Sequence, residues 1–241
     1  MSVSPEVSGT VLVREGGMTV HYPYSFSYCA TVELEAVPDS GYRFLCWSED
    51  LSGDDNPALL TISGLKTVTA RFVPIQGFTA WTEAHLEIGA LEGTITGLTA
   101  LDQTGVALLD GAPEDLRYGL IEMDIQVASP GGQAVIVIYL DEAAPQNYRF
   151  FKYDDSRGWF DFSRDVISGG VGDGAAFNGD RTVATIHITD NGDYDRNPAE
   201  GKIRDPLGFG ISASDESPSS GEDEGGGCFI DTAWYERMSL R

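Results

Sequence analysis

The chain has 241 residues, a length that suits one large all-β domain or two modest ones. Its residues are 41% hydrophobic and 10% aromatic, which is enough for a buried core and excludes disorder over the whole length. The formal charge is −23, from 38 acidic and 15 basic residues. Because phosphate binding needs concentrated Lys and Arg, this balance argues against nucleic acid or an anionic membrane surface as a partner. No apolar run reaches the roughly 18 to 20 residues of a membrane-spanning helix.

Short alternating segments dominate the first third of the chain. The strands predicted there are Thr10–Arg14, Thr31–Ala36, Arg43–Trp47, Leu59–Ile62 and Thr67–Phe72. In the second of them, Val32, Leu34 and Ala36 share one face and two glutamates lie on the other. A period of two with one solvated face predicts an antiparallel sheet.

The same region carries a motif. It consists of Gly41, Tyr42, Phe44 and Trp47, a loop with Leu51, Ser52, Gly53, Asn56 and Pro57, and a closing strand over Lys66–Phe72. This pattern resembles the internalin-B-type repeat (divergent InlB B-repeat, or bacterial repeat), a small β module of bacterial surface proteins. The resemblance covers residues 1–75 and implies a β-grasp-like repeat module there.

Two cysteines depart from that repeat pattern. Cys29 and Cys46 stand where the repeat usually has small residues such as Thr or Gly. They flank two strands that are expected to be neighbours, so a disulfide between them is one interpretation. Two free, buried thiols are the other.

The segment Ile75–Gly77 marks a boundary, and a second set of strands follows it. These are Glu92–Leu98, Tyr118–Ala128, Gln133–Leu140, Tyr148–Tyr153, Trp159–Phe162 and Arg181–Thr189. Turn sequences such as Ser129-Pro130-Gly131-Gly132 separate them. Regular short strands of this kind predict an antiparallel β-sandwich over residues 78–211.

This second block resembles another family. The resemblance rests on Tyr118-Gly119-Leu120, Phe151-Lys152-Tyr153, Gly158-Trp159, the acidic run Asp190–Asp195 and Ile203–Pro206. The order is similar to the choice-of-anchor U domain of bacterial proteins, which precedes varied C-terminal sorting signals. Arg204 and Leu207 depart from the usual ending. The resemblance implies a location more than an activity.

The C-terminal part changes composition. Residues 212–227 form an acidic Gly/Ser linker, which predicts a disordered, solvated tether. Residues 228–241 begin with Cys228-Phe229-Ile230 and resemble a CFI-box C-terminal signal, from which Asp231 and Trp234 depart. Cys228 is an anchor or processing point, as the resemblance implies, or a free thiol on a mobile tail.

One acidic loop is a candidate metal site. Its oxygen-bearing side chains are those of Asp190, Asp193, Asp195, Asn197 and Glu200. Spacing of one or two residues lets one loop wrap a hard cation such as a structural calcium ion. An acidic surface turn is the other interpretation. Asp173 and Asp180 could join the site if the preceding Gly-rich loop folds back.

Motifs of catalysis are absent from the sequence. No histidine lies in a His-Glu-x-x-His pattern, and there is no Gly-x-Ser-x-Gly elbow and no paired-cysteine zinc motif. The sequence therefore predicts that the protein is not an enzyme. The aromatic side chains of residues 148–162 are predicted to fill the sandwich core rather than to form a sugar-stacking platform.

Together these patterns predict a non-enzymatic structural or adhesive module of a bacterial cell surface, secreted or anchored at the envelope. Its expected partner is an extracellular protein or a glycan. The alternative is an accessory carbohydrate-binding module of a larger polysaccharide-acting protein. A third interpretation is a carboxylate-based hydrolase, for which no motif selects a pair among the 38 acidic residues. The expected location is extracellular or at the cell envelope. Met1–Glu6 lacks the basic start and apolar stretch of a signal peptide, so for an exported protein we expect the sequence to be a fragment or its start to be misassigned.

Overall fold

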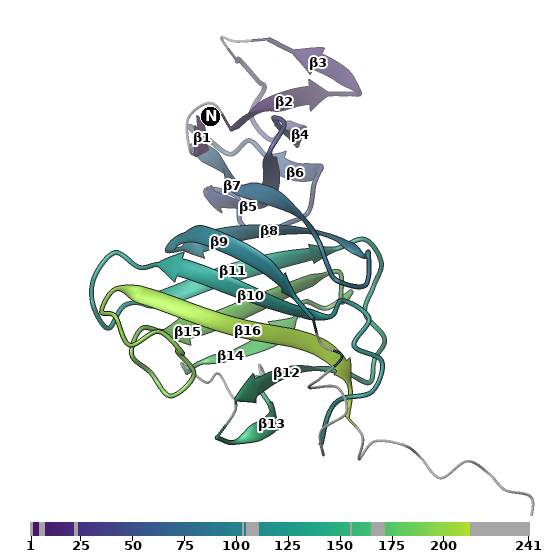
Figure 1. Cartoon of the computed structure of the whole chain (residues 1–241). Helices are drawn as coiled ribbons and strands as arrows, with labels where there is room; N and C mark the ends of the chain where they lie inside the picture. The colour runs from purple at the N-terminus through teal and green to yellow at the C-terminus, as the bar shows by residue number, and fades with distance from the viewer. Residues whose placement is uncertain are drawn as a thin grey trace, which may run out of the picture.

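The computed structural model describes residues 2–4, 8–21, 24–102, 104, 111–154, 156–164 and 172–212. These residues form β-strands and no helix, and the strands make two lobes (Figure 1). The all-β class predicted from the sequence is confirmed. Within the described ranges, no helix has the length and apolarity to cross a membrane.

The smaller, N-terminal lobe has two layers. One layer is a sheet of four antiparallel strands in the order β3 (Met18–Val20), β2 (Gly9–Glu15), β4 (Thr31–Pro38) and β6 (Ala58–Thr61). The other pairs β5 (Tyr42–Glu49) antiparallel with the first half of β7 (Val68–Thr79), while β1 (Ser2–Ser4) runs parallel to β7 on its other side. The described part of this lobe has no helix for a sheet to cover, so its second layer is a sheet instead of the helix of a β-grasp.

Alternation along the strands supplies the core of this lobe. In β4, Val32, Leu34 and Ala36 are buried, as the sequence pattern predicted. The buried core residues are Val13, Val32, Leu34, Ala36, Trp47, Ala58, Leu60, Val68, Ala70 and Phe72. Gly41 forms the turn between β4 and β5 with a φ of 82°, a left-handed conformation that favours glycine. Motif residues of the sequence are thus core and turn residues of the lobe.

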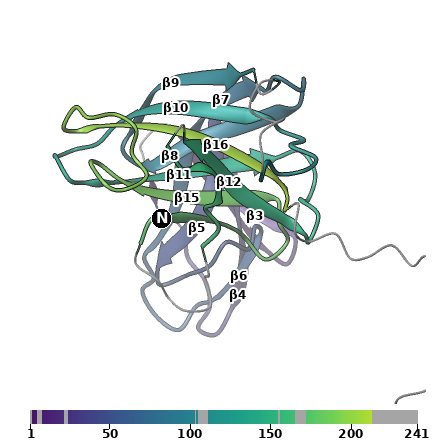
Figure 2. The same ribbon diagram turned by 60° about the horizontal axis from the view of Figure 1, so that its bottom comes forward.

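The larger lobe is a β-sandwich. Its first sheet has the order β7, β8 (His85–Glu92), β11 (Gln133–Leu140), β15 (Val183–Thr189) and β14 (Gly174–Phe177). Its second sheet has the order β13 (Gly158–Asp161), β12 (Tyr148–Asp154), β16 (Lys202–Ile211), β10 (Leu120–Gln126) and β9 (Thr94–Leu101). Figure 2 shows β9, β10 and β16 in one layer and β8, β11 and β15 in the other. One hydrophobic core lies between the two sheets.

Strand β7 belongs to both lobes. Its residues Val68–Pro74 pair with β5 in the small lobe, and Ile75–Thr79 pair with β8 in the sandwich. The boundary expected at Ile75–Gly77 therefore falls inside a continuous strand, although the two hydrophobic cores stay separate. A strand shared by two sheets is stiffer than a loop linker, because its backbone is hydrogen-bonded along its length.

The cysteine expectation needs a correction. Strand β4 pairs with β2 and β6, whereas β5 pairs with β7, so the strands flanked by Cys29 and Cys46 belong to different sheets. Both cysteines are free, Cys29 at an exposed turn and Cys46 half-buried in β5. The predicted neighbourhood of the two strands was wrong, and with it the reason for a disulfide.

Residues 213–241 lie outside the described residues. The predicted tether at 212–227, the resemblance to a CFI-box signal at 228–241 and the anchor or processing role of Cys228 all fall there, apart from Ser212. They stay predictions from the sequence.

Candidate binding groove between the two lobes

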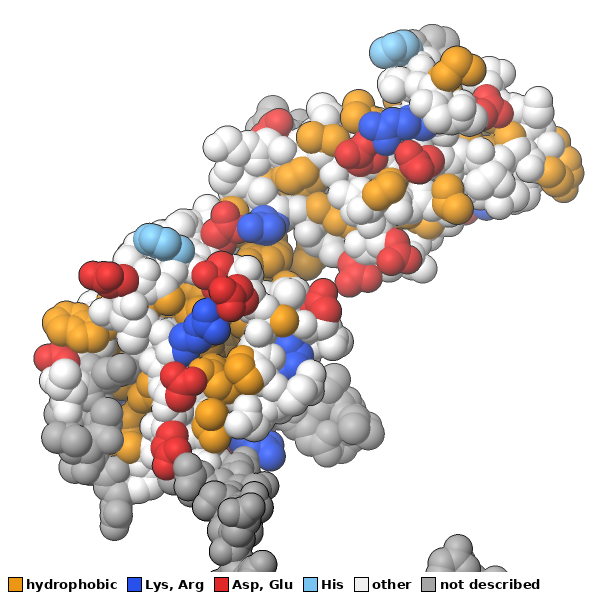
Figure 3. All heavy atoms as spheres, turned by 90° about the vertical axis from the view of Figure 1, so that its right-hand side faces the viewer, with side chains coloured by type: hydrophobic (Ala, Val, Ile, Leu, Met, Phe, Trp, Pro, Cys, Tyr) orange, Lys and Arg blue, Asp and Glu red, His pale blue; other side chains and the backbone are white. Residues whose placement is uncertain are grey.

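A groove of about 770 Å³ lies where the two lobes meet. Figure 3 shows the lobes in space-filling form, with acidic and basic side chains close together near their junction. One wall of the groove is the β4–β5 turn and the start of β5, and the opposite wall is the outer face of β11 with the loop before β15. The groove exists because β7 fixes the two lobes side by side at this angle.

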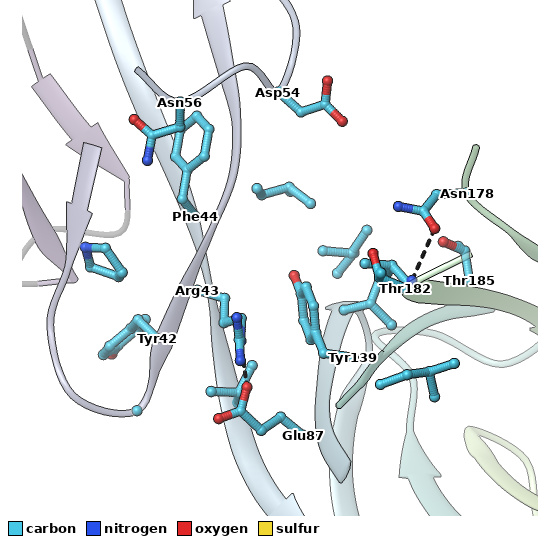
Figure 4. A pocket seen from close by; sticks show the side chains of 18 of the residues that line it. Tyr42, Arg43, Phe44, Asp54, Asn56, Glu87, Tyr139, Asn178, Thr182 and Thr185 are labelled. Atoms are coloured by element: carbon cyan, nitrogen blue, oxygen red, sulfur yellow. Dashed lines mark hydrogen bonds and ion pairs between the residues drawn. The ribbon is translucent and has the colours of Figure 1, made fainter. Parts of the chain in front are cut away.

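Three side chains from three strands meet at its floor. Arg43 of β5 forms an ion pair with Glu87 of β8, and its guanidinium lies over the ring of Tyr139 of β11, 5.1 Å from the ring centroid (Figure 4). A guanidinium over an aromatic face is an attractive cation–π contact. This trio links the small lobe to the sandwich through side chains, in addition to the shared strand.

Burial sets the protonation of Tyr139. Burial raises the pKa of the Tyr139 hydroxyl to about 12, with Arg43 opposing and Glu87 adding to the shift. At neutral pH the hydroxyl therefore keeps its proton and can donate a hydrogen bond to a ligand oxygen. The ring and the hydroxyl together offer one apolar and one polar contact inside the groove.

Other polar side chains at the groove already serve the fold. The Asn56 side chain accepts from the Ala36 amide and donates to the Ala36 carbonyl, each at 2.8 Å. Asn178 accepts from the Val183 amide at 2.9 Å, and Asp180 accepts from the amide and hydroxyl of Thr182. These bonds hold the groove walls in shape. Because the walls are pre-formed, a ligand would not have to order them.

The groove lacks the residue pairs of serine and cysteine hydrolases among its described lining residues. No histidine and no cysteine lies among the described residues that line it. A serine there, Ser40, therefore has no imidazole beside it to act as a general base. The arrangement suits binding through an aromatic ring, amides and carboxylates.

Two carboxylates of the predicted metal loop bind backbone amides. Asp190 is buried, and its Oδ2 accepts hydrogen bonds from the amides of Gly131 at 2.8 Å and Gly201 at 2.9 Å. Asp195 accepts from the amides of Asn197 and Arg204 on one oxygen and from Asn191 on the other. These two carboxylates therefore fix the loop by binding backbone amides.

The remaining members of that loop do not complete a cage. Asp193 and Glu200 are exposed, and the Asn197 side chain accepts from the Ala199 amide at 3.1 Å. Over the parts of the chain that are described, His, Cys, Asp and Glu form no group of three that could hold a metal ion. The calcium site at Asp190, Asp193, Asp195, Asn197 and Glu200 stays a prediction from the spacing alone.

The aromatic cluster is divided by burial. Tyr148, Phe150, Phe151 and Phe162 are buried in the sandwich. Tyr153, Trp159 and Phe160 are half-buried, and Trp159 packs against Tyr153 with ring centroids 5.5 Å apart. Tyr148, Phe150 and Phe162 therefore fill the core, and Phe160 packs against it. An exposed aromatic side chain occurs elsewhere, at Trp81, whose exposed fraction is 54%.

Sequence reasoning missed the groove residues. Arg43, Glu87 and Tyr139 are far apart in the chain and belong to no common motif. Only the order β5–β7–β8–β11 in the sheet brings them together. A signal was present only for Tyr139, which brings a polar group into a strand that is aliphatic from Ala134 to Ile138.

Comparison with known families supports the first resemblance. Residues 2–76 match the divergent InlB B-repeat domain, a non-catalytic repeat that is typical of bacterial surface proteins. This range corresponds to the small lobe and most of β7. The comparison identified no enzyme family, and neither the curated proteins nor the solved structures contain a match. The resemblances to a choice-of-anchor U domain and a CFI-box signal stay predictions.

Proposed function

We propose that the protein is a structural or adhesive module displayed at a bacterial envelope, in which the repeat lobe and the sandwich act as one stiff unit. The repeat match supplies the surface setting, since its family is typical of bacterial surface proteins. The acidic composition, with a formal charge of −23, suits a solvated position outside the cell.

One observation carries the proposal, namely the continuous strand β7. A seven-stranded sheet runs through both lobes with β7 in it, and the Arg43–Glu87 ion pair bridges the same junction. Inter-domain motion is the default where domains are joined by a flexible linker. A shared strand removes that linker, so the two lobes project their loops at a fixed angle.

The location is tested on intact bacteria that produce the protein. Antibodies raised against the purified protein are expected to label unpermeabilised cells, and external protease is expected to remove the label. Labelling that requires permeabilisation would overturn the surface assignment. The same antibodies on a strain that lacks the gene provide the background.

The stiffness is tested by distance measurements between spin labels on the two lobes. In a background with Cys29, Cys46 and Cys228 changed to Ser, labels at Leu65→Cys and Ser156→Cys report one inter-lobe distance, because both positions are exposed. We expect one narrow distance distribution. A broad distribution would show that the lobes move independently and would remove the role as a stiff spacer.

A second candidate function is glycan binding, favoured by the groove. Tyr139 offers a ring face and a protonated hydroxyl, and the pre-formed walls carry amides and carboxylates. Protein sites for sugars combine these elements, since sugars present apolar faces and many hydroxyls. In this case the protein would serve as an accessory carbohydrate-binding module.

A glycan array separates the two candidates. Binding that is lost in Tyr139→Phe or Tyr139→Ala would support the groove as a sugar site. Loss in Trp81→Ala or Trp159→Ala would place the site on those rings instead. An empty array with the folded wild-type protein would leave the structural role as the function.

A further inference from the structure

Two charged side chains of the sandwich are sealed inside it. Lys152 of β12 and Asp205 of β16 have exposed fractions of 2% and 0%, and the Lys152 Nζ lies 2.6 Å from the Asp205 Oδ1. Strands β12 and β16 are hydrogen-bonded neighbours, with Lys152 opposite Leu207, so the two side chains are a diagonal pair on one face. That face looks into the core, because Phe150 and Phe209 point the same way.

The polar atoms of this pair lack ordinary hydrogen bonds. Among the described residues, neither the Lys152 Nζ nor either Asp205 oxygen has a hydrogen-bond partner with acceptable angles, despite the short Nζ–Oδ1 approach. A buried ion pair that is not completed by further hydrogen bonds does not recover its desolvation cost. The pair is therefore poorly explained as a device that stabilises the fold by charge alone.

Apolar rings close the site to water. The Phe162 ring centroid is 3.8 Å from the Lys152 Nζ and the Tyr194 centroid 5.6 Å, and the two rings pack edge-on at 4.9 Å. Beside Lys152 there is a small pocket of about 10 Å³, lined also by Tyr194 and Pro206 and by the charged residues Asp154, Arg157 and Arg196. That volume is close to the minimum for a single water molecule.

The surroundings favour the uncharged forms of both groups. Burial lowers the pKa of the Lys152 amine, with the attraction of Asp205 opposing, and burial raises the pKa of the Asp205 carboxyl, with Lys152 opposing. The negative charges of Asp173 and Asp195 raise the pKa of both groups, which favours a proton on the pair. A neutral amine is a nucleophile, and a protonated carboxyl can release its hydroxyl as water.

We propose that Lys152 and Asp205 become joined by an amide bond inside the folded sandwich. The nitrogen lone pair of Lys152 attacks the Cγ of Asp205 and forms the C–N bond. The bond from Cγ to one carboxyl oxygen breaks, and that oxygen leaves as water with two protons, one from the carboxyl group and one from the amine. No atom is oxidised or reduced, and no other reactant is needed. Proximity replaces the activation that the same condensation requires in solution.

The cross-link has a mechanical consequence. It ties β12 to β16, the last described strand before residues 213–241. A force applied through the two ends of the chain would then leave the residues between 152 and 205 unstretched. This consequence deepens the proposed role as a spacer, but the bond itself does not depend on that role.

The mass of the denatured, full-length protein tests the bond directly. We expect the wild-type chain to be lighter than its sequence mass by one water molecule. Lys152→Ala and Asp205→Ala are expected at their full sequence masses. Lys202→Ala is the control: Lys202 is an exposed lysine on β16, the strand of Asp205, and this variant should still be lighter by one water molecule. A folded wild-type protein at its full sequence mass overturns the proposal, and this result needs no variant to fold.

Peptide mapping shows where the water is lost. Trypsin cannot cleave after an acylated Lys152, so we expect residues 150–157 to appear joined to residues 205–237. A water lost instead by succinimide formation at Asp110-Gly111 or Asp173-Gly174 would leave Lys152 cleavable, and it would overturn the proposal. Both outcomes are independent of whether the protein lies at the cell surface.

Stretching single molecules gives a second measurement on the wild-type protein. If the bond is present, the length released on unfolding is shorter by the segment between 152 and 205, about 18 nm at roughly 3.4 Å per residue. Full extension of the sandwich would contradict the cross-link. Surface labelling of cells, by contrast, would fail only if the proposed function fails.

Discussion

The two lobes differ in the size of their hydrophobic cores and in the charged groups that they bury. The repeat lobe has a small core between two narrow sheets, and its loops are tied down by backbone contacts, such as the Trp47 Nε1 donating to the Asp55 carbonyl at 2.8 Å. The sandwich has a larger core between two five-stranded layers, and it seals charged groups inside. The sandwich buries more apolar residues than the small lobe, and both lobes fix their loops through hydrogen bonds to the backbone.

This difference determines how the lobes depend on each other. A lobe of about 75 residues buries a smaller fraction of its surface than a larger domain and is correspondingly marginal. Strand β7 gives the small lobe a rigid attachment to the larger sandwich. We therefore expect damage to the sandwich core to cost most, damage to the junction less, and damage to single surface contacts least.

The largest effect is expected from Phe209→Ala. Phe209 is fully buried and its ring lies 5.4 Å from the rings of both Tyr118 and Phe150. Removing a buried phenylalanine ring is expected to lower the free energy of unfolding by about 3–5 kcal/mol. Hydrogen exchange should show the lost protection mainly in β11 and β16, with β2 and β4 changed less. Leu65→Ala, at a side chain that is 99% exposed, is the control and should stay within about 0.5 kcal/mol.

The next largest loss of stability is expected from a substitution of Asp190. Asp190→Asn removes a charged acceptor from the Gly131 and Gly201 amides and is expected to lower the free energy of unfolding at pH 7 by about 1.5–3 kcal/mol. Asp193→Asn, an exposed position in the same loop, should be nearly neutral. Equal losses in the two variants would contradict the role of the Asp190 hydrogen bonds.

The same carboxylate predicts a dependence on pH. Burial alone would raise the pKa of Asp190, but the Gly201 and Gly131 amides hold that pKa below its ordinary value. Its contribution to stability is therefore full above the unfolded-state pKa of about 4 and is lost as the pH falls through the lower folded-state pKa. Urea midpoints measured from pH 7 downwards should fall less steeply in Asp190→Asn than in the wild type. Parallel curves would contradict this linkage.

The junction between the lobes is tested with a glycine on β8. A Cβ on Gly89 would lie 2.6 Å from the Pro74 carbonyl oxygen and 2.9 Å from a Val73 methyl, both on β7. Gly89→Ala must push β7 and β8 apart, and we expect a loss of about 1–3 kcal/mol. Gly77→Ala, on β7 with open space around its Cβ, is the matched control. The distance distribution between the two lobes should broaden in Gly89→Ala only.

Many of the strands could be predicted from the sequence, because the alternation of apolar and polar residues is clear where a strand has one solvated face. Each segment predicted as a strand overlaps an observed strand. Strands β1, β3, β14 and β16 were missed. In β16, Pro206 lacks an amide hydrogen and two glycines interrupt the pattern, features that argue against a central strand. In the structure this strand lies between β12 and β10, with Pro206 opposite Glu122.

The candidate sites were harder to predict from the sequence. The spacing of Asp190 and Asp195 suggested a cation, but carboxylates at the same spacing also bind backbone amides, which local sequence does not distinguish. The groove and the Lys152–Asp205 pair depend on which strands become neighbours, and strand order was not predictable from alternation. Lys152 carried one hint, since it stands between Phe151 and Tyr153 in an aromatic strand.

The smallest loss of stability is expected from Arg43→Ala at the junction of the two lobes. Arg43→Ala removes both the ion pair with Glu87 and the cation–π contact with Tyr139, at a site where Arg43 and Glu87 remain partly exposed. Exposed pairs of this kind contribute about 0.2–1 kcal/mol, so the shared strand should still hold the lobes together without it. A double-mutant cycle with Glu87→Ala measures the coupling. A coupling well above this range, with a broadened inter-lobe distance, would mean that the side chains rather than β7 fix the angle between the lobes.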